Sequence, residues 1–153
     1  MGKQSAGILL YQKNDNQLQV LLVHPGGPFF RNKDLGVWSI PKGEFLDDEE
    51  ALTAAKREFE EETGKAISGD FIPLKPVTLK SRKTIYAWAV EGEIDPETIV
   101  SNLFEMEWPP KSGRMQSFPE IDRAGWFDLS EAKSKINAAQ AGLIEELEEI
   151  NMS

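Results

Sequence analysis

Residues 43–64 read GEFLDDEEALTAAKREFEEETG and form the most informative part of this 153-residue sequence. A helix is predicted from Asp47 to Thr63, because Asp47 is a good capping residue and Glu50, three residues later, completes a capping box. Gly64 is expected to end the helix in the usual way for glycine. The segment therefore predicts one helix between two glycines.

Three acidic side chains of this helix share one arc. At about 100° per residue, the spacing i, i+3, i+4 brings Glu58, Glu61 and Glu62 together. Carboxylates this close repel one another, and the helix dipole opposes them near the C-terminus. One interpretation is a solvated acidic face, and the other is a site for a divalent cation that prefers oxygen ligands. The neighbouring arcs are predicted to face the core (Leu52, Ala55, Phe59) and the solvent (Lys56, Glu60).

The neighbours of the cluster favour the metal site. Glu49 lies about two turns before Arg57 on the same side of the helix, where its carboxylate is able to hold the guanidinium. Gly43 and Gly64 bracket the helix where the backbone must turn sharply or approach another group closely. We expect Arg57 to orient Glu49 and the acidic cluster rather than to touch a substrate.

These residues resemble the signature of the Nudix hydrolases, G-x5-E-x7-R-E-U-x-E-E-x-G-U, in which U is a bulky aliphatic residue. The fixed positions fall in register at Gly43, Glu49, Arg57, Glu58, Glu61, Glu62 and Gly64. Phe59 occupies the first U position, and Lys65 departs from the pattern at the last. The resemblance implies an α/β fold, a Nudix-type α/β/α sandwich with a mixed β-sheet between helices, as a single domain over residues 1–153.

The resemblance also implies the chemistry. Glu58, Glu61 and Glu62 would hold Mg²⁺ or Mn²⁺, with Glu58 as a ligand or a general base, and the backbone carbonyl of Lys42 would be a further ligand. Glu120, in a loop late in the chain, is the candidate for a catalytic base or an extra ligand; its alternative is an ordinary surface glutamate. The remaining signature residues would orient the ligands (Arg57) or have structural roles (Gly43, Glu49, Gly64).

Basic and aromatic side chains are the candidates for substrate binding. The basic candidates are Lys42, Arg31, Lys80, Arg82 and Lys83. The alternative for each of them is an ordinary solvated surface residue. Tyr86, Trp88 and Phe118 are candidates for stacking on a base, although the core is the better interpretation for Trp88. His24, the only histidine, makes a poor metal site alone and is expected to be packed or partly exposed at a strand end.

Two further stretches bear on the substrate. Residues 38–43, WSIPKG, resemble the approach to the signature in several Nudix subgroups, and residues 82–88 with 118–126 resemble the diadenosine tetraphosphate hydrolases. A dinucleoside polyphosphate is the expected substrate, with a nucleoside triphosphate or an RNA 5′ end as alternatives. The alternative of another class is a non-catalytic module that senses a nucleotide; such a module should have lost metal carboxylates, and all are present here.

Apolar patterning predicts the other elements. Strands joined by a turn are expected at 5–11 and 18–24, and further strands at 37–40, 71–79, 84–91 and 125–129. Asp95–Gln116, which contains WPPKSGR, is expected to be an irregular insertion or lid. From Ser130 onwards the pattern is helical, with an apolar stripe at Ile136, Ala139, Leu143, Leu147 and Ile150.

Composition limits the partners. A net charge of −9 argues against a general nucleic-acid or anionic-membrane surface, because both require a basic footprint. The apolar runs are too short to span a bilayer. The absence of cysteine excludes disulfides, thiolate catalysis and sulfur-bound zinc, and fits a cytoplasmic protein. A small nucleotide is therefore the expected partner, and the sequence leaves the oligomeric state open.

Overall fold

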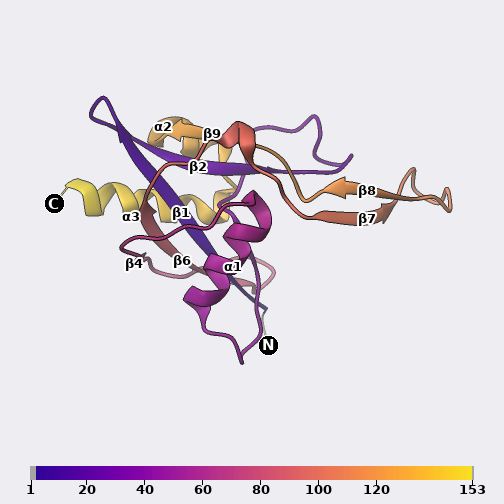
Figure 1. Cartoon of the computed structure of the whole chain (residues 1–153), viewed down its shortest axis with the longest axis horizontal. Coiled ribbons are helices and arrows are strands. Elements are labelled where there is room, and N and C mark those ends of the chain that lie inside the picture. The colour runs from indigo at the N-terminus through magenta and orange to yellow at the C-terminus, as the bar shows by residue number, and fades with distance from the viewer. Residues whose placement is uncertain (1–2, 153) are drawn as a thin grey trace.

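A computed structural model describes residues 3–152 and has a mixed β-sheet at its centre (Figure 1). The strand order is β4-β6-β1-β2-β9, with β3 also paired to β1 and β5 to β6. Strands β1 and β6 are parallel, and the other pairs are antiparallel. The strands are β1 (Gln4–Asn14), β2 (Gln17–Pro25), β3 (Lys42–Glu44), β4 (Ile72–Pro73), β5 (Val77–Thr78), β6 (Thr84–Glu91) and β9 (Ile121–Asp128).

Helices cover both faces of this sheet. Because successive side chains of a strand point to opposite faces, Ile8 and Leu10 of β1 pack in one core cluster and Leu9 in the other. The first cluster includes Phe59 of α1 (Ala51–Thr63), and the second includes Leu143 of α3 (Ala141–Met152). Helix α2 (Leu129–Lys135) and the short helix η2 (Ala138–Gln140) precede α3, and η1 (Pro96–Thr98) follows β6. The expected α/β/α sandwich with a mixed sheet is confirmed.

Helix α1 begins later than the sequence predicts. It starts at Ala51, with Glu50 at the N-cap and no side-chain cap, so the capping box proposed for Asp47 and Glu50 is wrong. The Asp47 carboxylate instead accepts a hydrogen bond from the Gln4 side chain at 2.8 Å, which ties the segment to β1. The C-terminal end agrees with the prediction: Gly64 has φ 75° and donates its N–H to the Glu60 carbonyl.

Other predicted elements are confirmed or corrected. The strands expected at 5–11, 18–24 and 84–91 are present as β1, β2 and β6. The continuous strand expected at 71–79 is wrong, because Pro73 and Pro76 lack the N–H that a ladder needs, and only β4 and β5 form. The strand expected at 37–40 is reduced to two isolated bridges, Val23 to Ser39 and Trp38 to Ile136. Strand β9 begins at Ile121, earlier than predicted, since it pairs with β2 along most of its length.

Residues 103–119, here called the arm, form a second small sheet where an irregular segment was expected. Strands β7 (Leu103–Glu107) and β8 (Met115–Pro119) pair in register, with Phe104 opposite Phe118. The arm projects from the body of the molecule, to the right in Figure 1. The prediction of irregular structure is therefore wrong for these residues, because the alternating sequence LFEME forms β7 and pairs with β8 across the connection formed by residues 108–114.

The C-terminal helical pattern is interrupted. Helix α2 ends at Lys135, with Ile136 as its extended C-cap, and Asn137 caps η2 through its side chain before α3 begins. Of the predicted stripe, Ile136, Leu143 and Leu147 are fully buried. Within the part of the chain that the structure describes, no helix is both long and apolar enough to cross a membrane.

Candidate active site

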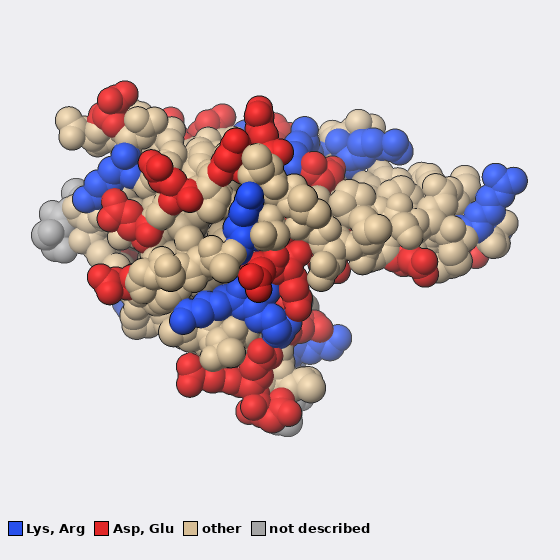
Figure 2. Space-filling view, in the orientation of Figure 1, with Lys and Arg blue, Asp and Glu red and all other residues tan. Residues whose placement is uncertain are grey.

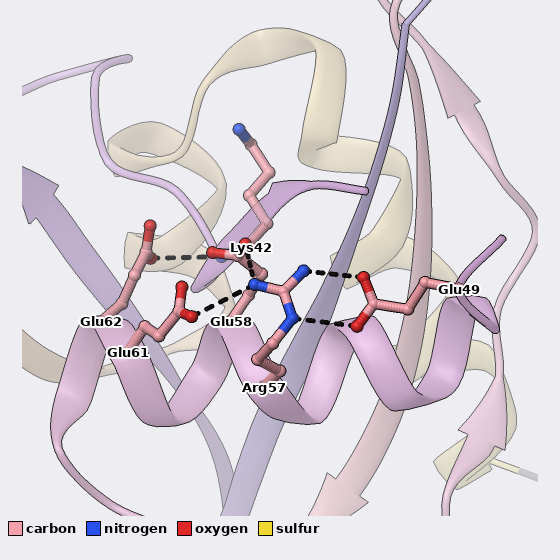
Figure 3. Close-up of polar contacts among 6 residues, drawn as sticks. All are labelled: Lys42, Glu49, Arg57, Glu58, Glu61 and Glu62. Atoms are coloured by element: carbon pink, nitrogen blue, oxygen red, sulfur yellow. Dashed lines mark hydrogen bonds and ion pairs between the residues drawn. The ribbon is translucent and has the colours of Figure 1, made fainter. Parts of the chain in front are cut away.

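Arg57 organises the acidic face of α1 (Figure 3). Its Nε and Nη2 donate to the two carboxylate oxygens of Glu49, each at 2.9 Å, which is the ion pair expected from the sequence. Its Nη1 donates to Glu58 at 2.8 Å and to Glu61 at 3.2 Å. The hydrogen bonds from Arg57 hold the pKa of Glu49 below its usual value. One guanidinium thus fixes three carboxylates and offsets their mutual repulsion.

Glu62 is the most strongly perturbed acid of the cluster. Burial raises its pKa to about 8, although the backbone N–H of Lys42 donates to Oε1 at 3.2 Å and favours the charged form. A carboxylate in this state gains strongly from a nearby cation, which restores its charge. The hydrogen bond also joins the C-terminal half of α1 to β3.

Gly43 allows Glu58 to lie against the backbone of β3. A Cβ atom at position 43 would stand 2.0 Å from Oε2 of Glu58 and 2.1 Å from its Cδ. Any other residue would displace this carboxylate. Partial burial raises the pKa of Glu58, with the hydrogen bond from Arg57 acting in the opposite direction. The first glycine of the signature is therefore required by Glu58, the first acid of the helix face.

Glu120 approaches the cluster from the turn between β8 and β9. The N–H of Glu120 donates to the carbonyl of Asn102, and the carbonyl of Glu120 accepts from the N–H of Gly26. The N–H of Asn102 in turn donates to the carbonyl of Glu61 on α1. Loss of hydration and the charge of Glu61 raise the pKa of Glu120. A residue far along the chain is thus held beside α1 by backbone hydrogen bonds.

A cavity of about 170 Å³ joins these parts. Its polar lining includes Lys42, Glu62 and Glu120, so the structure brings together three residues that the sequence places in the site. The rest of the lining is mainly apolar: Val23, Pro25, Val37, Ser39, Ile40 and Ile121. Burial lowers the pKa of Lys42, and its ammonium points away from the carboxylates in Figure 3.

The carboxylates of the site have the chemistry that a hard divalent cation prefers, but they do not converge on one point in this structure. Among residues 3–152, no three histidine, aspartate or glutamate side chains converge as a ready-made metal site. In this structure Arg57 and the N–H of Lys42 hold oxygens of Glu58, Glu61 and Glu62. All available donors are oxygens, which is the set that Mg²⁺ and Mn²⁺ prefer.

The other predicted substrate contacts lie away from this cavity. Lys83 pairs with Glu44 at 3.4 Å, and Arg82 is exposed in the turn before β6, with φ 70°. Tyr86 packs edge-on against Phe45, with ring centroids 6.2 Å apart, beside the α1 core cluster. Arg31 is exposed in the loop after β2. None of these four residues lines the cavity.

The sequence gives no sign of a second polar centre at His24. The ring is fully buried, with Nδ1 2.8 Å from Asp122 and Nε2 2.7 Å from the carbonyl of Lys33. It also meets Trp38 edge-on at 5.1 Å. His24 therefore ties β2 to the loop that follows it and to the start of β9. Because Asp122 is 98 residues away, no local pattern could have revealed this contact.

Comparison with known proteins defines the class. A family model described as NUDIX domain matches residues 1–147, so the chain belongs to this family. It is accordingly a Nudix hydrolase of acid anhydrides, a class that generally uses divalent metal ions. None of the curated proteins matches the chain by sequence.

Solved structures agree on the fold. A C. elegans Ap4A hydrolase in a binary complex superposes with a TM-score of 0.64 at 19% identity, covering 98% of each chain. The NUDIX domain of Shewanella oneidensis NrtR, complexed with ADP ribose, gives 0.65 at 18% identity over 97% of this chain and 88% of that one. A mutT/nudix family protein from Listeria innocua gives 0.62 at 19% identity, over 99% and 98%. At such identities these likenesses show the fold alone.

Proposed function

We propose that this protein hydrolyses a phosphoanhydride bond in a nucleoside diphosphate linked to another group, and that its substrate is a dinucleoside polyphosphate. The observation that carries the proposal is the cavity where Lys42, Glu62 and Glu120 meet beside the clamp made by Arg57. The cavity brings two carboxylates and one lysine together, which supports a site that takes a cation and the phosphates of a nucleotide.

Glu58, Glu61 and Glu62, with the backbone carbonyl of Lys42, are proposed to hold Mg²⁺ or Mn²⁺. The bound cation would supply Lewis acidity and offset the charge of the phosphates. Arg57 keeps Glu58 and Glu61 on the same side of α1, and Glu49 holds Arg57 at its other edge. Gly43 gives Glu58 the space that it needs.

Glu120 is the proposed base, with a role as extra ligand as the alternative. Its raised pKa makes it a better proton acceptor than an ordinary glutamate. The backbone hydrogen bonds to Asn102 and Gly26 fix its distance from α1. Glu58 could instead take the proton, and its position beside Gly43 serves either role.

Two observations support the substrate assignment. The fold is shared with an Ap4A hydrolase, and Lys42 places a cation at the cavity. Arg31, Arg82, Lys83 and Tyr86 stay proposed contacts for the parts of a long substrate outside the cavity. A nucleoside triphosphate or an RNA 5′ end is the second choice, and the net charge of −9 disfavours long RNA.

A nucleotide-sensing module is the competing function of another class. One observation favours this function: the NUDIX domain of Shewanella oneidensis NrtR, which shares the fold, was solved in complex with ADP ribose. The complete set of signature carboxylates favours an enzyme in this chain. A cytoplasmic location also remains a proposal.

Product release from a panel of nucleotides, with Mg²⁺, with Mn²⁺ and with chelator, tests the function. We expect metal-dependent cleavage of a dinucleoside polyphosphate in preference to the other substrates. Glu62→Gln should remove most of the activity, and Glu60→Gln, on the exposed side of the same helix, is the matched control. Turnover that survives in chelator would rule out the metal mechanism, and binding without turnover would favour the sensor.

A further inference from the structure

The two faces of the arm differ in chemistry. Residues directly opposite each other in an antiparallel pair share a face, and the register gives one face with Phe104, Met106, Gln116 and Phe118, here called the aromatic face. The other face carries Leu103, Glu105, Glu107, Met115, Ser117 and Pro119. Both glutamates of the paired strands therefore lie on the second face, and an anionic ligand would be repelled less by the aromatic face.

The loop after β2 adds to the aromatic face. Phe104 lies so close to Gly27 that a Cβ there would meet its ring at 2.9 Å. Further along, Phe29 meets Trp108 edge-on, with ring centroids 5.3 Å apart, and 55% of Phe29 is exposed. Exposed aromatic rings of this kind are the platforms on which nucleobases stack.

The tip of the arm supplies positive charge. Trp108 donates its N–H to the carbonyl of Arg114, so these two residues are cross-strand neighbours. Lys111 follows in the turn, where its N–H donates to Glu107. Among the described residues, no acidic side chain forms an ion pair with Lys111 or Arg114. In Figure 2 the arm is mainly uncharged, with acidic side chains along its lower edge and basic side chains at its tip, in a protein whose net charge is −9.

The distance to the acidic cluster limits what could occupy this surface. Strand β8 leads directly to Glu120, and at about 3.3 Å per residue Arg114 and Trp108 lie about 20 Å from it. A mononucleotide whose phosphates lie in the cavity would not reach so far. A ligand with a second base beyond a chain of phosphates would.

We propose that Phe29, Trp108 and Arg114 form the subsite for the distal nucleoside of a dinucleoside polyphosphate. This inference rests on the proposed function and adds the element that selects two-base substrates. The ring of Trp108 stacks on the distal base, and the ring of Phe29, which stands at 82° to it, contacts the edge of that base. The guanidinium of Arg114 attracts the adjoining phosphates.

The test compares two substrates that share a phosphate chain, a dinucleoside tetraphosphate and the corresponding nucleoside tetraphosphate. In Trp108→Ala, the ratio of kcat/KM for the first over the second should fall at least about fivefold, mainly through KM, since stacking of one base is lost. Trp108→Phe should restore most of the ratio. Met115→Ala, on the opposite face and 63% exposed, should leave it unchanged.

The possible results separate this proposal from the function on which it rests. If the wild-type protein cleaves no dinucleoside tetraphosphate, the proposed function fails and the subsite fails with it. If it cleaves this substrate but Trp108→Ala and Phe29→Ala both leave the ratio unchanged, only the subsite is wrong. Using two variants from different segments protects the test against a folding defect in either.

Two other occupants would overturn the proposal and are detected in the same experiment. A loss confined to a short 5′-triphosphorylated RNA would assign the aromatic face to RNA. A wild-type dimer in sedimentation that Trp108→Ala dissociates would assign it to a second copy of the chain.

Discussion

Helix α1 and the arm both lie beside Glu120, but they are held in different ways: side-chain hydrogen bonds fix the acidic face of α1, and backbone hydrogen bonds fix the base of the arm. On α1, Arg57 binds three carboxylates, and Lys42 donates to a fourth through its N–H. Backbone hydrogen bonds of Asn102 and Glu120 join the arm to the body at its base, and Phe104 and Trp108 pack against the loop after β2. We infer that the carboxylates needed for hydrolysis are held in fixed positions on the helix, and that the sequence of the arm can change from one substrate to another.

The largest effect is expected from a pair of phenylalanines, one in each region. Phe59→Ala should lower the free energy of unfolding by about 3–5 kcal/mol, because it empties a fully buried position beneath α1. Phe104→Ala, at a half-buried position in the arm, should cost about 1 kcal/mol. Chemical denaturation measures both, and equal losses would show that the arm is as integral to the fold as α1.

Glu120→Gln should come next. If Glu120 is the base, the variant loses about 100-fold or more in kcat, while its free energy of unfolding changes little. The pKa of Glu120 is raised, so activity in the wild-type protein should begin to fall at a higher pH than an ordinary glutamate would give. This acidic limb of the pH profile should be absent in the variant. An unchanged rate would move the base to another residue, with Glu58 the first candidate.

A conservative change at the centre of the clamp should have a smaller effect. Arg57→Lys keeps the charge but cannot bind Glu49 through two parallel hydrogen bonds. We expect a loss of about 10- to 100-fold in activity or in metal affinity, as for other residues that orient ligands. Activity and metal affinity both near wild-type would show that charge alone suffices. Lys56→Arg, on the exposed side of α1, controls for the change of side chain.

The smallest effect concerns pH and stability without metal. Glu62 has a folded-state pKa of about 8, above its unfolded value of 4.5, so the folded state prefers the protonated form. Stability should therefore fall as pH rises from about 4.5 to about 8. The slope should be at most about 1.4 kcal/mol per pH unit, the value for one titrating group. Mg²⁺ should oppose this fall and Glu62→Gln should flatten it; a metal-free curve that rises over this range would contradict the assignment.

The sequence predicts α1 well because its determinants are local. The spacing of Glu58, Glu61 and Glu62 follows from helix geometry, and Glu49 lies just before the helix, close enough in sequence to reach Arg57. The start of the helix was misplaced because the Asp47 carboxylate is used by Gln4, which is distant in sequence. Local capping rules do not account for such a competing partner.

The arm and the His24 centre were missed for different reasons. The alternation of Leu103 to Glu107 is a strand signal, but the Pro109-Pro110 pair made the segment look irregular. The contact of His24 with Asp122 depends on the antiparallel pairing of β2 with β9, which no short motif specifies. The subsite proposed on the arm depends on Phe29 meeting Trp108, which is likewise a product of the folded chain.

The hydrogen bond from the N–H of Glu120 to the carbonyl of Asn102, 2.9 Å long, has an evolutionary consequence. It shows that the chain leaves the body and returns to it at one place, with the whole arm between. A segment whose ends are already joined can lengthen, shorten or be exchanged at small entropic cost, without changing the sheet or the catalytic helix. In that sense the arm is an interchangeable part, through which one hydrolytic centre could be adapted to new substrates.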